Sequence, residues 1–117
     1  MLDQKNIDDL RSRPVAPQQH LINGAWVAAS DGGTRDVLSP IDGSLVTTIA
    51  EGTEADVDAA VASAKAAFED GRWSRMAPVQ RKQILQRFAD LIQKHALELA
   101  VLGVRDNGTE IGMAIKA

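Results

Sequence analysis

The side chains able to perform acid–base or metal chemistry are few in this 117-residue sequence. His20 and His95 each lack a carboxylate or second ligand at a spacing that stands out for a general base or a metal site. We therefore expect both histidines to be structural or exposed to solvent. Glu51, Glu54, Asp56 and Asp58 lie close together at the start of a helical pattern, where negative charge is favourable without any catalytic role.

The sequence contains no cysteine. This excludes disulfides, thiolate metal ligands and a cysteine nucleophile within the chain. The glycines at 103, 108 and 112 follow no strand pattern and do not have the spacing that holds a pyrophosphate, and the pair Gly32-Gly33 is typical of a turn. No nucleophile has an adjacent base. We predict neither catalytic nor cofactor-binding residues in this chain.

Two β-hairpins are predicted within residues 19–50. Asn23-Gly24 stands between apolar runs at 20–22 and 25–27, and this dipeptide accepts the positive φ angles of a type I′ turn. The second hairpin has strands at 35–39 and 44–50, separated by a Pro-Ile-Asp-Gly turn. Before them, residues 1–18 predict a short polar helical turn and an extended lead-in, since prolines at 14 and 17 disfavour helix in the residues that precede them.

After the hairpins the apolar period changes to that of helices. Thr53 is a predicted N-cap for a helix over 54–69, ended by Asp70-Gly71. A second helix should begin near Pro78, and a third over 96–104 should stop at Asp106-Asn107-Gly108. The apolar stripes of the first two helices consist of Val57, Ala60, Val61, Ala64 and Phe68, then Ile84, Leu85, Phe88, Leu91 and Ile92. The residues after Gly108 could begin another helix, and we expect the chain to be cut there rather than finished.

The composition indicates a soluble globular α/β segment with a thin core. Hydrophobic residues make up 44% but aromatic residues only 3%, so alanine dominates the apolar fraction and little bulky surface is available to bury. We expect these elements to pack against something larger. A net charge of −3 with interleaved basic residues gives no reason to expect nucleic acid, and no segment resembles a membrane span or a leader peptide, so we expect a cytoplasmic location.

Four blocks in order give residues 21–108 a resemblance to the aldehyde dehydrogenase superfamily. They are Leu21 to Trp26, Ser39 to Gly43 with Ile49 to Gly52, Ala55 to Phe68, and Arg81 to Ile92 ending in Asp106-Asn107-Gly108. The stretch Phe68 to Ser74 is most similar to enzymes that oxidise γ-glutamyl-γ-aminobutyraldehyde and betaine aldehyde. Thr109-Glu110-Ile111 departs from the Lys-Pro that many members carry there.

The resemblance implies the N-terminal portion of a homo-oligomeric, NAD(P)-dependent aldehyde dehydrogenase. In that family a cysteine attacks a small aldehyde to form a thiohemiacetal, hydride passes to the nicotinamide, and a glutamate activates water to release the acid. Those groups lie downstream of the matched region. We therefore expect residues 19–117 to be an incomplete part of the cofactor-binding domain that flanks a Rossmann-like sheet absent here, with no aldehyde-dependent NADH production and marginal folding by the isolated chain.

The resemblance also implies a structural monovalent cation, since some members bind one near this point. The ligands map onto the backbone carbonyls of Val37 and Leu38 and the carboxylate of Asp106. Oxygen ligands suit a hard cation. The alternative is that Asp106 only caps a turn.

Two other functions remain open. The chain could be a non-enzymatic assembly or binding fragment, or it could derive from relatives that act on phosphorylated or CoA-linked acyl substrates. The residues that would decide between them are not in the matched region.

Overall fold

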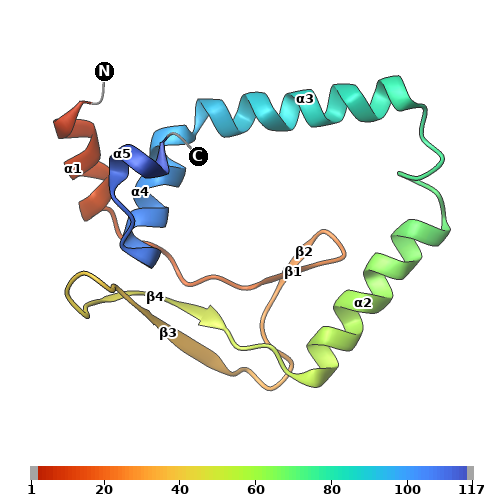
Figure 1. Ribbon diagram of the computed structural model, residues 1–117. Helices are drawn as coiled ribbons and strands as arrows, with labels where there is room; N and C mark the ends of the chain where they lie inside the picture. Colours follow the sequence, from red (N-terminus) through yellow and green to blue (C-terminus); the bar gives the residue numbers. More distant parts are fainter. Residues whose placement is uncertain (1–2, 116–117) are drawn as a thin grey trace. The chain divides into compact units, whose positions relative to one another are not determined.

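The computed structural model describes residues 3–115 and contains one helix, then two hairpins of short strands, then a run of helices (Figure 1). In order, the elements are α1 (Gln4–Ser12), β1 (His20–Ile22), β2 (Ala25–Val27), β3 (Thr34–Leu38), β4 (Leu45–Ala50), α2 (Glu54–Glu69), α3 (Pro78–Lys94), α4 (Ala96–Asn107) and α5 (Ile111–Ala114). This confirms the predicted order of two hairpins followed by helices. Among the described residues, no helix combines the length and the apolar character that crossing a membrane requires.

The first hairpin forms as its turn residues predict. Strands β1 and β2 are antiparallel, with Leu21 opposite Trp26. Asn23 and Gly24 have φ angles of 52° and 74°, the left-handed conformation that a type I′ turn needs at both central positions. Only three residues pair on each side, so the turn itself determines the register.

The second hairpin is held by its turn as much as by its strands. The N–H of Ser39 donates to the carbonyl of Ser44, and the N–H of Gly43 donates back to the carbonyl of Ser39, each at 2.8 Å. Asp42 accepts hydrogen bonds from both the hydroxyl and the backbone N–H of Ser44, and these bonds lower the pKa of its carboxyl. The regular strands therefore end at Leu38 and begin again at Leu45, one residue short of the predicted limits.

The start of α2 is defined by a capping box. The Thr53 hydroxyl accepts the N–H of Asp56, and the Asp56 carboxylate accepts the N–H of Thr53 at 2.9 Å. The same carboxylate accepts the N–H of Ser30, at 3.1 Å to each oxygen. One aspartate thus joins the start of α2 to the loop after β2.

Helices α3 and α4 begin where the sequence predicts, but α4 runs to Asn107, three residues beyond the predicted end at 104. Pro78 opens α3, and His95 separates it from α4. Gly108 ends α4 with a φ of 75°, a conformation that residues with a Cβ rarely adopt. The short helix α5 follows.

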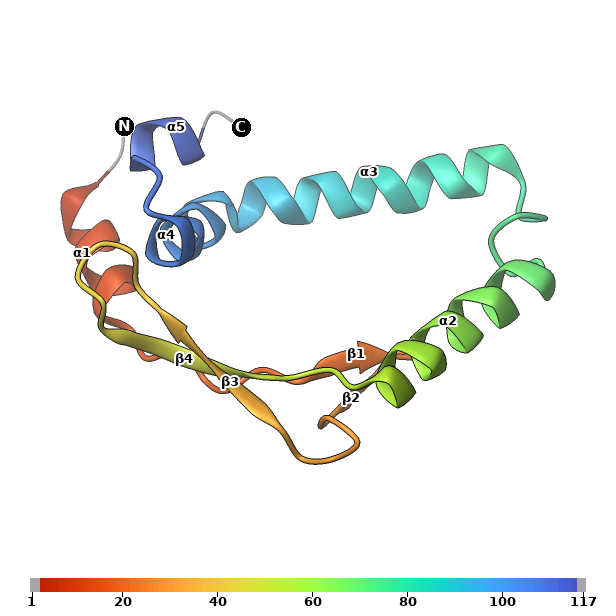
Figure 2. The same cartoon turned by 60° about the horizontal axis from the view of Figure 1, so that its bottom comes forward.

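The chain divides into two compact units. One comprises residues 1–16, 36–47 and 89–117, and the other comprises residues 17–35 and 48–88. In the first, α1 packs against α4, as Figures 1 and 2 both show, and Arg105 donates a 2.7 Å hydrogen bond to the carbonyl of Arg13. In the second, the hairpin of β1 and β2 contacts α2.

The apolar core is thin, as the alanine-rich composition predicts. In the part of the chain that the structure describes, the buried apolar residues are Ala29, Ala100 and Val101. By contrast, the larger apolar side chains of α2 and α3 are exposed, with 74% of Phe68 and 61% of Phe88 accessible to solvent. The elements are therefore well defined locally but bury little surface against one another.

Candidate functional site

The three residues implied as cation ligands belong to the same unit. Val37 and Leu38 are the last two residues of β3, and Asp106 lies in the last turn of α4. A Cβ placed on Gly108 would lie 3.3 Å from Cγ of Pro40. Pro40, two residues after β3, therefore lies against Gly108, the residue that follows α4.

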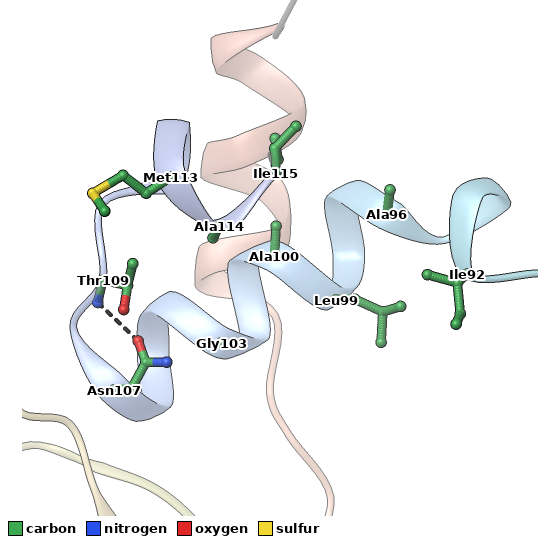
Figure 3. A pocket seen from close by; sticks show the side chains of 10 residues that line it. All are labelled: Ile92, Ala96, Leu99, Ala100, Gly103, Asn107, Thr109, Met113, Ala114 and Ile115. Carbon is green, nitrogen blue, oxygen red and sulfur yellow. Dashed lines mark hydrogen bonds between the residues drawn. The ribbon is translucent and has the colours of Figure 1, made fainter. Parts of the chain in front are cut away.

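The side chain of Asp106 is not used to cap the turn. Asn107 performs that role, since its Oδ1 accepts the N–H of Thr109 at 2.8 Å (Figure 3). The exposed carboxylate of Asp106 makes neither a hydrogen bond nor an ion pair with the described residues. Its oxygens, together with backbone carbonyls, are the hard donors that an alkali cation prefers.

No cluster suited to a transition metal accompanies this site. Across residues 3–115, no three histidine, cysteine, aspartate or glutamate side chains come together in a way that could hold a metal ion. Any cation here would depend mainly on backbone oxygens.

The two histidines lie in separate units and different surroundings. His95 is exposed at the start of α4, and its Nδ1 lies 3.4 Å from Oε2 of Glu98. The expectation that His95 lacks a carboxylate partner was therefore wrong, and the i, i+3 spacing of Glu98 indicated this partner. His20 in β1 is partly buried against Gly52, and its Nε2 is buried with no hydrogen-bond partner among the described residues.

Of the four carboxylates near α2, Asp56 is the buried one. Hydrogen bonds from the backbone N–H groups of Thr53 and Ser30 hold the pKa of its carboxyl below the ordinary value. Glu51 instead forms an exposed ion pair with Arg35. Asp56 thus serves as a capping group at the start of α2, and its partner Ser30, 26 positions away, had no local signal in the sequence.

The structure contains an apolar pocket that sequence reasoning missed. It has a volume of about 470 Å³ and lies along α4 and α5. Figure 3 shows the side chains around it, and they are Ile92, Ala96, Leu99, Ala100, Gly103, Asn107, Thr109, Met113, Ala114 and Ile115. Asn107 and Thr109 are the polar members, and the other lining residues are apolar. The pocket therefore presents a mainly apolar lining with two polar side chains.

The sequence profile of the aldehyde dehydrogenase family matches residues 26–116. The chain is 42% identical to human mitochondrial 10-formyltetrahydrofolate dehydrogenase over 86% of its own length and 11% of that protein. It is 40% identical to the mitochondrial aldehyde dehydrogenase family 2 member B4 of Arabidopsis thaliana, over 88% of its length and 19% of that relative. The chain thus spans less than a fifth of these curated relatives.

The chain is also similar to solved structures along nearly its whole length. A γ-glutamyl-γ-aminobutyraldehyde dehydrogenase from Burkholderia cenocepacia is 36% identical with a TM-score of 0.92, and the match covers 99% of this chain and 24% of that one. A betaine aldehyde dehydrogenase from Staphylococcus aureus in complex with NAD+ is 31% identical with a TM-score of 0.85, covering 97% and 22%. The hairpins and helices described above reproduce the N-terminal part of that fold. The chain belongs to the aldehyde dehydrogenase family.

Proposed function

We propose that this chain is the N-terminal structural part of an NAD(P)-dependent aldehyde dehydrogenase and supplies none of the reacting groups. The observation that carries the proposal is the TM-score of 0.92 along 99% of the chain against an enzyme of which it represents only 24%. The reaction converts an aldehyde, water and NAD(P)+ into a carboxylic acid, NAD(P)H and a proton. Because the chain has no cysteine, the thiolate nucleophile must come from another part of the enzyme.

A chimera tests this function directly. This chain replaces the corresponding segment of the Burkholderia cenocepacia enzyme, and aldehyde-dependent NADH production is measured with the chimera and with the 117-residue chain alone. We expect activity from the chimera and none from the chain alone. An inactive chimera that still folds and binds NAD+ would contradict the proposed role, and turnover by the purified chain alone would overturn the assignment of chemistry to other parts of the enzyme.

We further propose that the enzyme belongs to the branch acting on γ-glutamyl-γ-aminobutyraldehyde or betaine aldehyde. Enzymes with both activities occur among the structural neighbours, which supports the proposal. A benzaldehyde dehydrogenase from Antirrhinum majus is 43% identical over 81% of the chain, so the segment is also similar to enzymes for aromatic aldehydes. The test is a comparison of kcat/KM for these three aldehydes with an enzyme that carries this chain in its natural context; a preference for benzaldehyde would exclude the amino-aldehyde branch.

Residues 19–117 are proposed to be part of the cofactor-binding domain of a homo-oligomeric cytoplasmic enzyme. NAD+ bound to the Staphylococcus aureus enzyme supports NAD as the cofactor over NADP. The full enzyme that carries this chain in its natural context tests two of these points: the ratio of its rates with NAD+ and NADP+ gives the cofactor, and sedimentation gives the assembly.

The cation site is proposed to use the carbonyls of Val37 and Leu38 with the carboxylate of Asp106. The contact between Gly108 and Pro40 and the unpaired state of Asp106 among the described residues support it. Potassium should raise the thermal midpoint of the chimera, and Asp106→Ala should abolish that increase. Asp58→Ala, which removes an exposed carboxylate on α2, is the matched control. An unchanged potassium dependence in Asp106→Ala would reject the site.

A further inference from the structure

We propose that the exposed apolar faces of α2 and α3 in the second unit dock the remaining part of an aldehyde dehydrogenase subunit, and that this docking does not need a covalent link. The inference rests on the proposed function and adds the partner of one surface. The surface is defined by Val57, Val61 and Phe68 of α2 and by Leu85 and Phe88 of α3. All five residues belong to the unit that contains residues 48–88.

These faces are apolar and uncovered. On α2, Val57, Val61 and Phe68 recur at helical spacing, and each is more than half exposed. On α3, Leu85 and Phe88 lie one turn apart and are 56% and 61% exposed. Apolar side chains repeated at this spacing are typical of a helix face that another element covers, because leaving them in water costs free energy in proportion to their area.

The size of the structural neighbours identifies what covers them. The chain superposes along its entire length on an indole-3-acetaldehyde dehydrogenase with a TM-score of 0.92, yet it accounts for 27% of that chain. The segment therefore adopts the same conformation within a polypeptide nearly four times as long. The rest of such a subunit is the occupant to which we commit, in preference to a second copy of this chain.

The elements of this unit are specified by contacts within the unit itself. The type I′ turn of the first hairpin and the capping box of α2 need no residue outside residues 17–35 and 48–88, and the same holds for the bonds from Ser30 to Asp56. A surface that is already shaped before binding loses less conformational entropy on association. Binding between separate polypeptides is therefore expected to retain the native arrangement.

The experiment compares linked and separate versions of the same parts. The Burkholderia cenocepacia enzyme without its corresponding segment is co-expressed with this chain carrying an affinity tag, and also with its own native segment as the positive control. The chimera provides the covalently linked version. We expect the truncated enzyme to co-purify with this chain and to show aldehyde-dependent NADH production.

Variants locate the docking surface. Phe68→Glu and Phe88→Glu should each lower the amount of co-purified enzyme about tenfold or more, because an unpaired charge would enter an apolar interface. Lys82→Glu, which places the same charge at a polar, exposed position of α3, should leave the amount unchanged.

Each outcome separates the two proposals. If the chimera is active but the separate parts do not co-purify, the docking inference is overturned and the proposed function stands. This holds whether or not the native segment binds the truncated enzyme. An inactive, folded chimera contradicts the proposed function. Equal binding by the phenylalanine variants, or a dimer of this chain that the truncated enzyme does not dissociate, also overturns the docking inference.

Discussion

Thr53 contributes to the second unit through a single hydroxyl group. It accepts the N–H of Asp56 at 3.3 Å and lies 2.6 Å from the hydroxyl of Ser30. Replacing Thr53 with alanine should weaken the first turn of α2 by about 1 kcal/mol, which raises the exchange rates of its amide hydrogens about fivefold. Hydrogen exchange of the 117-residue chain measures this. Thr53→Ser keeps the hydroxyl and should exchange like the wild type; an equally fast Ser variant would show that the methyl group, not the cap, matters.

Asp56 makes the stability of the same region dependent on pH. Its folded-state pKa lies below the ordinary 3.8, because backbone N–H groups donate to the ionised carboxylate. A depressed folded pKa gives stability that is fully present above the unfolded value and is lost as the pH falls through the folded value. Relative to Asp56→Asn, the wild type should therefore protect α2 better at pH 7, and the advantage should shrink as the pH falls below 3.8.

Comparing the two proteins at each pH removes the intrinsic pH dependence of hydrogen exchange from the Asp56 measurement. Asp58→Asn, an exposed neighbour on the same helix, serves as the matched control and should show no such pH-dependent difference. A wild-type advantage that stays constant from pH 7 to well below 3.8 would contradict the role of the ionised Asp56 carboxylate.

At the scale of elements, two glycines of α4 should respond to alanine in opposite directions. Gly103 lies inside the helix and a Cβ there would meet no atom within 4 Å, so Gly103→Ala should stabilise α4 by up to about 1 kcal/mol. Gly108 has a φ of 75° and its Cβ would press on Pro40, so Gly108→Ala should cost about 1 kcal/mol or more. Hydrogen exchange of α4 distinguishes them. A Gly108→Ala variant as stable as the wild type or more stable would disprove the left-handed cap.

The contact between α1 and α4 provides a second test at this scale. Arg105 donates to the carbonyl of Arg13 at 2.7 Å across 92 positions of sequence. Removing this charge-assisted bond with Arg105→Met should cost about 1 kcal/mol or somewhat more and should speed amide exchange in α1 several-fold. Arg87→Met, at an exposed position of α3, is the matched control. Unchanged protection of α1 in Arg105→Met would mean that apolar packing alone holds the helix.

The elements that could be predicted are those specified by neighbouring residues. Asn23-Gly24 and Thr53 with Asp56 contain the whole turn and the whole cap, so the first hairpin and the start of α2 follow from the sequence. Contacts over long separations carry no such signal. The bonds from Ser30 to Asp56 and from Arg105 to Arg13 depend on the packing of distant elements, and periodicity does not report that packing.

At the scale of the whole molecule, composition predicted the thin core but not the division into two units. A sequence rich in alanine and poor in aromatic residues has little to bury, and the buried apolar residues among those described are correspondingly small. The boundaries between the units could not be predicted from the sequence. They fall inside β3, β4 and α3, and the residue pattern of each of these elements continues unbroken across the boundary. For the candidate site, the resemblance supplied Val37, Leu38 and Asp106, and no spacing rule would have selected them.

The exposed aromatic rings should govern how the isolated chain behaves in solution. Phe68 and Phe88 contribute little to the internal packing of the chain, being 74% and 61% exposed, so replacing both with glutamine should leave its helix content unchanged. It should also reduce self-association and the binding of a hydrophobic dye, because large exposed apolar patches promote both. Far-UV circular dichroism, dye fluorescence and light scattering measure the three properties. The control replaces Ala59 and Ala62 with glutamine, because both are exposed residues of α2 that lie outside its apolar stripe. A loss of helix in the double phenylalanine variant would show that these rings pack within the chain, and the docking surface would then have to lie elsewhere.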